Sequence, residues 1–364
     1  MSQTYLSKLQ ITNFRNLNND IIEFSNGINC IFGDNGNGKT NLLEAISYLV
    51  NKKSFRKKTN FQQLINVECD KPEIIFSSYF VGAESFTLTG KVNLDGSQWF
   101  VNNVQSKKKT ILNTIFINPF DSFSFHSIPS FRRNWFDTHI SMISKEYKSV
   151  LNKYNSALRF RNSLLAKKPT NFRDQILAID EQLSHYSFIL ISERKKFLKE
   201  IQEYCMLTFK IIFDESHDLE IEIDSKFSSS SLNDIKDYYK ENLEKDIIIG
   251  HTRSGVHRDD YIFNFDGYNS FEYCSLGQQK MSFLSLLFAY IELFRYKFMS
   301  YPMVLIDDVS GELDARRWKN LISYLQAKDF QVLITTANEN FKKELEKIEE
   351  AKKIFINNGF IEIK

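Results

Sequence analysis

The chain has 364 residues, of which 42% are hydrophobic and 25% are charged, and its formal net charge at pH 7 is +2. This composition is typical of a soluble globular protein. The net charge is too small to indicate nucleic-acid binding by itself, so any contact with a polyanion would have to come from local basic patches. The length predicts two domains, or one large domain with an insertion.

The cysteines and the apolar stretches limit the cellular setting. Cys30, Cys69, Cys205 and Cys274 are far apart and show no Cys-x-x-Cys spacing, which favours free thiols in a reducing compartment. The start of the chain has no signal-peptide pattern, and the most apolar stretch, 281–294, is interrupted and too short to span a bilayer. We therefore expect a cytoplasmic protein without membrane contact.

The first part of the chain is predicted to be mainly sheet. Short alternating runs at 5–14 and 20–32 predict strands, and a glycine-rich turn then leads into a helix that ends at about Val50. Alternation with glycine punctuation returns between about Pro72 and Phe100. This stretch predicts a second antiparallel sheet.

The middle of the chain is predicted to be helical. Between about Asn134 and Phe213, Pro169 is the one proline, and apolar residues recur at spacings of three and four. This periodicity predicts two long amphipathic helices of about 30–40 residues each, separated near 167–174. A strand at 217–224 and a serine-rich loop follow, with a helix N-cap at Ser231 or Asn233.

The last part of the chain returns to an α/β pattern. Continuous apolar runs at 303–306 and 332–335 predict strands buried on both faces of a parallel sheet. We therefore predict one α/β lobe formed by residues 1–118 and 245–364, and a mostly helical lobe formed by residues 119–244.

A phosphate-loop motif lies between the third predicted strand and its helix. The sequence GDNGNGKT matches G-x-x-x-x-G-K-[ST], and its glycines permit positive φ and close approach of backbone N–H groups to a polyphosphate. Lys39 would bridge the β- and γ-phosphates, and the Thr40 hydroxyl would ligate Mg²⁺. We therefore predict that ATP and Mg²⁺ are the cofactors and assign to ATP binding Gly33, Asp34, Asn35, Gly36, Asn37, Gly38, Lys39 and Thr40.

An acidic pair follows the apolar run 303–306. Asp307 stands at the carboxyl end of a predicted buried strand, which is where such ATPases hold Mg²⁺, so we predict Asp307 and Thr40 as the metal ligands. Asp308 is placed to orient or deprotonate an attacking water. Asp308, Asp307 and Lys39 are the predicted catalytic residues; solvated acids that end a strand are the alternative.

Two further motifs resemble those of ABC-type ATPases. The sequence CSLGQQK, 274–280, resembles the signature motif, with Ser275, Gly277 and Gln278 matching and Leu276 replacing a glycine usual in transporters. The sequence SGELD, 310–314, resembles the D-loop, in which Asp314 would cross a dimer interface. The resemblance implies that the signature binds the γ-phosphate held by a second subunit.

Longer strings resemble the RecF family of bacterial recombination mediators. They are 9–49, 53–56, 127–137, 154–165 and 255–263. The resemblance implies an α/β fold of the ABC-type ATPase head, with a phosphate loop, a mixed sheet, an antiparallel subdomain and an inserted helical lobe, similar to an SMC head without its coiled coil.

The resemblance to the RecF family also implies a function. ATP would drive formation of a homodimer that binds gapped, single-stranded or junction DNA without sequence preference. With RecR and RecO it would promote RecA loading, replication restart and the SOS response, and weak DNA-stimulated ATP hydrolysis would reset it. Arg56, in KSFR, would lie near the nucleotide phosphates.

Several residues depart from the ABC pattern. Asp308 replaces the usual glutamate, which suggests slow hydrolysis, although the RecF family commonly has this acid pair. Thr335 or Thr336 stands where transporters have a switch histidine, so no γ-phosphate sensor is assigned. Asn118 or Asp121 would replace the glutamine of the Q-loop near the metal.

Some features have open interpretations. Basic clusters that could contact DNA, or simply be solvated, contain Lys52, Lys53, Arg56, Lys57 and Lys58; Lys107 to Lys109; Arg132 and Arg133; and Arg159, Arg161, Lys167 and Lys168. The string around His257, Arg258 and Asp259 is either an internal ion-pair network or a functional contact. Alternatives for the whole chain are a stand-alone ABC-type subunit of a transporter or defence system, and a pseudo-ATPase scaffold.

Overall fold

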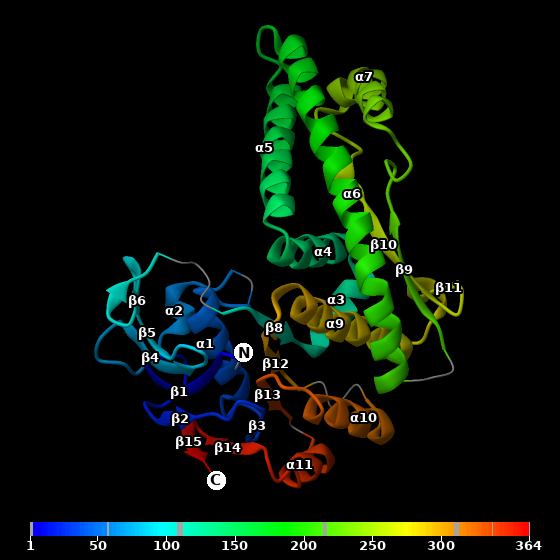
Figure 1. Ribbon diagram of the computed structural model, residues 1–364. Coiled ribbons are helices and arrows are strands. Elements are labelled where there is room, and N and C mark those ends of the chain that lie inside the picture. The colour runs from blue at the N-terminus through cyan, green and yellow to red at the C-terminus, as the bar shows by residue number, and fades with distance from the viewer. Residues whose placement is uncertain are drawn as a thin grey trace. The chain divides into compact units, whose positions relative to one another are not determined.

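A computed structural model describes residues 3–56, 58–107, 112–213, 217–308, 313–336 and 338–363 (Figure 1). The chain forms two compact units, Met1–Asp121 with Phe294–Lys364, and Ser122–Leu293. Residues 245–293 thus group with the helical unit, whereas the sequence placed them with the α/β lobe. The reason is a long-range pairing, because strand β10 (Asp260–Phe265) pairs along its whole length with β9 (Leu219–Asp224).

The phosphate loop and Asp307 follow the carboxyl ends of two strands of a six-stranded sheet. Its order is β15-β14-β3-β13-β12-β8, and all neighbours are parallel except β15 with β14. Every residue of β3, β12 and β13 is buried, as their continuous apolar runs predict. The strands are β3 (Ile28–Phe32), β8 (Thr114–Ile117), β12 (Met303–Ile306), β13 (Val332–Thr335), β14 (Lys352–Asn357) and β15 (Phe360–Ile363).

Helix α1 (Lys39–Asn51) joins this sheet to a second one. Its buried residues include Leu42, Leu43, Ile46 and Leu49, at helical spacing, in a cluster that includes side chains of both sheets. The Tyr48 ring of α1 stacks on Phe76 of the second sheet at 5.8 Å. The first unit also contains α2 (Phe61–Leu64), α10 (Ala315–Gln326) and α11 (Glu339–Glu346).

The second sheet of this unit is antiparallel and has the order β2-β1-β4-β5-β6-β7. The predicted antiparallel sheet at 72–100 is confirmed by β4, β5 and β6. It also includes the start of the chain, which was not expected, because β4 pairs with the opening strand β1 from Tyr5 to Thr12. Local alternation shows which residues face the core but not which strand lies alongside. The strands are β1 (Tyr5–Thr12), β2 (Ile21–Glu23), β4 (Ile74–Val81), β5 (Phe86–Asn93), β6 (Gly96–Val101) and β7 (Val104–Gln105).

Between Pro129 and Ile212 the second unit has three helices where two were expected. The first expected helix is divided at Ser144, which ends α4 (Pro129–Ile143) and caps α5 (Lys145–Lys167) by accepting a bond from the Tyr147 N–H. The break at 168–171 is confirmed, and α6 (Phe172–Ile212) has 41 residues. Ser231 is confirmed as the N-cap of α7 (Leu232–Ile249). The remaining elements are α3 (Pro119–Ser127), a 3-10 turn (Val256–Arg258), β11 (Tyr268–Asn269), α8 (Ser270–Tyr273) and α9 (Leu276–Phe298).

Buried ion pairs hold the second unit together. Arg161 is fully buried, with its guanidinium 2.6 Å from Asp180 and 2.7 Å from Asp246. Arg194 lies 2.7 Å from Asp259, so this part of the string around His257 belongs to an internal ion-pair network.

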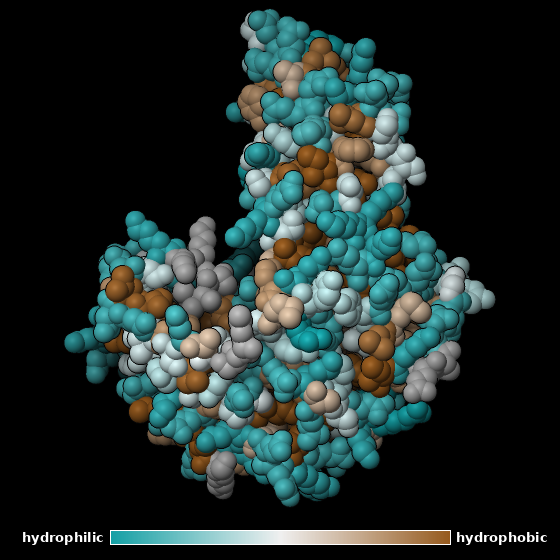
Figure 2. Space-filling model, viewed as in Figure 1, coloured by the Kyte–Doolittle hydropathy of each residue, from teal (hydrophilic) through white to brown (hydrophobic). Residues whose placement is uncertain are grey.

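Figure 2 shows a mainly hydrophilic face over α5–α7, with apolar side chains scattered among polar ones.

Two candidate DNA-contacting residues are therefore corrected. Arg161 is buried as described, and Arg132 is buried and lies 2.6 Å from Asp260. Neither guanidinium is available to a phosphate backbone.

Within the described ranges, no helix combines the length and the apolar character needed to cross a membrane.

Candidate nucleotide site

The phosphate loop leaves β3 and begins α1. Gly33, Gly36 and Gly38 all have positive φ, at 155°, 86° and 114°, the conformation that glycine adopts without strain. A Cβ on Gly33 would lie 2.3 Å from the Ile356 carbonyl oxygen. The loop therefore has the backbone conformation predicted from its glycines.

Lys39 is held inside this loop. Its side chain is 7% exposed, and Nζ donates to the carbonyl oxygens of Gly33 at 2.7 Å and Asp34 at 3.1 Å. Burial lowers the pKa of Lys39, while the nearby Asp308 and Asp307 act in the opposite direction. The ammonium group is thus positioned at the N-terminus of α1, where an anion is favoured.

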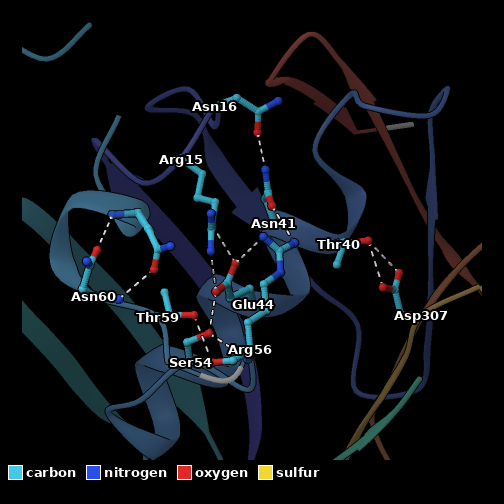
Figure 3. Close-up of polar contacts among 11 residues, drawn as sticks. Arg15, Asn16, Thr40, Asn41, Glu44, Ser54, Arg56, Thr59, Asn60 and Asp307 are labelled. Atoms are coloured by element: carbon cyan, nitrogen blue, oxygen red, sulfur yellow. Dashed lines mark hydrogen bonds and ion pairs between the residues drawn. The ribbon is translucent and has the colours of Figure 1, made fainter. Parts of the chain in front are cut away.

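Thr40 and Asp307 meet across the carboxyl edge of the sheet (Figure 3). The Thr40 hydroxyl lies 3.0 and 2.8 Å from the two carboxylate oxygens of Asp307. Burial raises the pKa of Asp307, while hydrogen bonds from Thr335 and Thr40 lower it. A hydroxyl and a partly buried carboxylate in contact are the oxygen donors that Mg²⁺ uses beside substrate phosphates, so these residues fit the metal.

Thr335 has a structural role that the sequence did not assign. Its hydroxyl donates to Asp307 Oδ1 at 2.8 Å and accepts the backbone N–H of Asp308 at 3.0 Å. Asp308 itself has a φ of 43°, so the chain turns sharply directly after Asp307. Thr335 thus holds the Asp307 side chain and the Asp308 backbone in place. In the sequence, the one indication of this role was the position of Thr335 at the end of the buried strand next to β12.

Arg56 belongs to a second polar cluster, made with Arg15, Glu44 and Ser54 (Figure 3). Glu44 is fully buried and accepts from Arg15 at 2.7 and 2.9 Å and from Ser54 at 2.5 Å. Arg56 lies 3.2 Å from the same carboxylate and donates to Asn41 Oδ1 at 2.9 Å. Two guanidinium groups share one carboxylate, so the cluster keeps positive charge next to the phosphate-loop helix.

The signature residues begin α9 in the second unit. Ser275 and Gly277 are exposed. Ser275 Oγ accepts the Gln278 N–H at 3.3 Å, and Gln278 Oε1 accepts the Ser275 N–H at 2.9 Å. Gln278 therefore has a local capping role in addition to the nucleotide role predicted for it.

The other predicted residues have local roles as well. Asp314 is the N-cap of α10 and accepts the Arg317 N–H at 2.9 Å. Asn118 directly follows β8, and its carbonyl accepts the Asp121 N–H at 3.1 Å. Residues 310–312 of the D-loop and the basic residues Lys57, Lys108 and Lys109 lie outside the described residues.

Known proteins match this chain over nearly its whole length. Residues 5–361 match the model of the RecF/RecN/SMC N-terminal domain. The DNA replication and repair protein RecF of Clostridium kluyveri is 32% identical over 368 residues, which cover 98% of each chain. That of Clostridium tetani is 31% identical over 369 residues, with the same coverage.

Solved structures give the same result for the fold. The recombination mediator protein RecF–ATP of the RecFOR pathway has a TM-score of 0.84 at 28% identity and covers 100% of each chain. The Smc head domain of Pyrococcus furiosus has a TM-score of 0.59 at 14% identity, over 99% of this chain and 96% of its own, which shows a shared fold. The predicted ABC-type head is thereby confirmed, and the chain belongs to the RecF family of DNA replication and repair proteins.

Proposed function

We propose that this chain is an ATP-dependent DNA-binding switch in recombinational repair. The observation that carries the proposal is the contact of Thr40 with Asp307 beside the phosphate loop, in a chain that matches RecF–ATP along its full length. In this function ATP assembles a dimer on gapped or single-stranded DNA. RecR and RecO would then act with it in RecA loading, replication restart and SOS induction.

The residues of the first unit have separate roles in nucleotide binding and hydrolysis. Loop N–H groups and Lys39 bind and orient the phosphates, and Thr40 with Asp307 would hold Mg²⁺. The metal, when bound, neutralises charge on the phosphate oxygens. Asp308 orients the attacking water, and its short side chain agrees with slow, DNA-stimulated hydrolysis that resets the switch.

The second unit supports the dimer. Ser275 and Gly277 are exposed at the N-terminus of the long helix α9, where a second copy can present its nucleotide phosphate. In the first unit, Asp314 is exposed at the start of α10. Two identical composite sites, each with one phosphate loop and one partner signature, are what a two-fold symmetric dimer produces.

Binding to gapped duplex DNA, with and without ATP and Mg²⁺, tests this function. We expect ATP to tighten binding by about tenfold or more and the affinity to fall steeply with salt, because the contacts are to the phosphate backbone. Lys39→Ala should lose the response to ATP but keep its fold. A wild-type affinity that is the same with and without ATP would contradict the proposal.

The same measurement separates the alternatives. A pseudo-ATPase scaffold predicts that Lys39→Ala behaves as the wild type does. A transporter subunit predicts no response to DNA and association with a membrane partner; the comparisons support the repair function and give that alternative no support.

A further inference from the structure

The hairpin at the end of the chain reaches the nucleotide site. Its strands β14 and β15 are joined by Asn358 and Gly359, both with positive φ, at 49° and 84°, which is the conformation that an Asn-Gly hairpin turn favours. β14 is parallel to β3, with Phe355 opposite Phe32. The turn therefore lies at the sheet edge where the phosphate loop begins.

The hairpin contacts the phosphate loop at two places. The Gly359 N–H donates to the Asn37 carbonyl at 3.1 Å, and Asn37 Nδ2 donates to the Ile356 carbonyl at 3.3 Å. The same Ile356 carbonyl oxygen lies where a Gly33 side chain would be, 2.3 Å from an ideal Cβ. The hairpin thus packs on the first residue of the loop through β14 and on the middle of the loop through β14 and the turn.

Gly359 also packs on the loop that follows β1. A Cβ on Gly359 would lie 1.8 Å from the Asn16 carbonyl oxygen, and the Gly359 carbonyl accepts the Asn18 N–H at 2.9 Å. Asn16 in turn donates to the Gly36 carbonyl at 3.3 Å and accepts from Asn41 at 2.7 Å (Figure 3). These are largely backbone contacts, so no side-chain rotation can make room for an added methyl group.

We propose that the turn Asn357–Phe360 is a positioning element of the nucleotide site. A loop with three glycines loses much conformational entropy when it is ordered, and this loss subtracts from the affinity for the phosphate. Contacts from the hairpin hold the loop peptides in place and reduce that loss. The inference depends on the proposed ATP-binding function, since it assigns a further element to that same site.

A matched pair of substitutions, Gly359→Ala and Gly267→Ala, tests the proposal. Gly267 is in the β10–β11 hairpin, has a φ of 80° after Asp266 at 50°, and would place its Cβ more than 4 Å from other groups. Both variants carry the strain of a positive φ, and Gly359→Ala adds the clash with the Asn16 carbonyl, so Tm without nucleotide should fall slightly for Gly267→Ala and further for Gly359→Ala. Titration with a fluorescent ATP analogue should give a Kd raised about tenfold for Gly359→Ala and changed by less than about twofold for Gly267→Ala.

The possible results are distinct. An unchanged Kd for Gly359→Ala, or equal weakening in both variants, overturns the positioning role. Wild-type protein that does not bind ATP overturns the proposed function instead. If Gly359→Ala does not fold, hydrogen exchange of the wild type decides: ATP should protect amides in 354–361, and unchanged exchange there overturns the proposal.

Discussion

Glu44 is the residue on which the positive cluster beside the phosphate loop depends. Its buried carboxylate holds Arg15 and Arg56 together, and without that charge the two guanidinium groups would face each other across a neutral amide. We expect Glu44→Gln to lower the free energy of unfolding by about 3 kcal/mol and to slow ATP turnover by misplacing Arg56. Urea denaturation and steady-state turnover measure the two effects.

Glu244→Gln is the control for this change. Glu244 pairs with Arg173 on the surface, where ion pairs add little to stability. The urea midpoint of Glu244→Gln should equal that of the wild type. Equal stability of Glu44→Gln and the wild type would show that the buried carboxylate is not needed to hold the arginines.

Asp308 and Asp307 should respond differently to loss of charge. Asp307 contacts Thr40, whereas Asp308 occupies the sharp turn that follows. Asp308→Asn should therefore still bind ATP but lose about 100-fold or more of its turnover, so that dimers accumulate in gel filtration. A monomer at saturating ATP and Mg²⁺ would count against the assigned role.

The sequence predicted the residues of the site better than their supporting contacts. Lys39, Thr40 and Asp307 were predicted because a motif or a strand end marks each of them. The roles of Thr335 and Glu44 were missed because they come from contacts between different segments of the chain; Thr335 and Asp307, for example, are 28 positions apart. No local pattern contains that information.

At the scale of elements, the N-terminus of α9 provides a direct test of the dimer. Ser275→Arg removes the cap of α9 and adds bulk where the partner's phosphate would lie. We expect ATP binding to be retained and ATP-dependent dimerisation to be lost in sedimentation velocity. Loss of both would indicate misfolding.

Ser231→Arg provides the matched control. Ser231 also caps a helix of the second unit through a capping box, with Asp234, so the two variants should lose similar stability, about 1 kcal/mol. Ser231→Arg should dimerise normally. Dimerisation lost equally in both variants would mean that helix capping, not contact with the partner's nucleotide, explains the effect.

The elements that the sequence predicted well are those with strong local signals. The buried strands β12 and β13 were predicted from their continuous apolar runs, and Ser231 was one of two residues, with Asn233, predicted as the cap of α7. The division at Ser144 was missed because apolar spacing continues through it, although the serine side chain ends one helix and begins the next. The pairing of β4 with β1 was missed because two alternating strands are compatible with many partners.

At the scale of the whole molecule, buried histidines make stability depend on pH. Burial lowers the pKa of His126 to about 4 from the ordinary value of 6.5, and its Nδ1–H donates to the Ser122 carbonyl at 2.9 Å. The unfolded chain therefore takes up a proton at a pH where the folded chain does not, and stability falls as pH decreases from 6.5 to 4.

Thermal unfolding at pH 7.5 and pH 5 measures this effect. The wild type should have a lower Tm at pH 5 than at pH 7.5. His126→Leu should show a smaller difference in Tm, because leucine takes up no proton. The His126 ring packs among Phe125, Phe263 and Phe271, so an apolar side chain suits the site. A pH dependence that is the same in both proteins would assign the effect to other groups.

Whole-molecule organisation was the hardest feature to predict from the sequence. The first boundary was placed at 118/119, close to the observed 121/122. The second was placed at 244/245, whereas the observed division is at 293/294. The strand-like pattern of 245–293 led to this difference, since its strand β10 pairs with β9 of the helical unit.

Sedimentation velocity of the wild type with and without ATP and Mg²⁺ tests most directly the claim that two copies share their nucleotides. We predict a monomer that converts to a dimer when ATP is added, with no conversion in Lys39→Ala, which cannot hold the phosphates. A wild type that remains monomeric at saturating ATP and Mg²⁺, with gapped DNA present, would contradict the account.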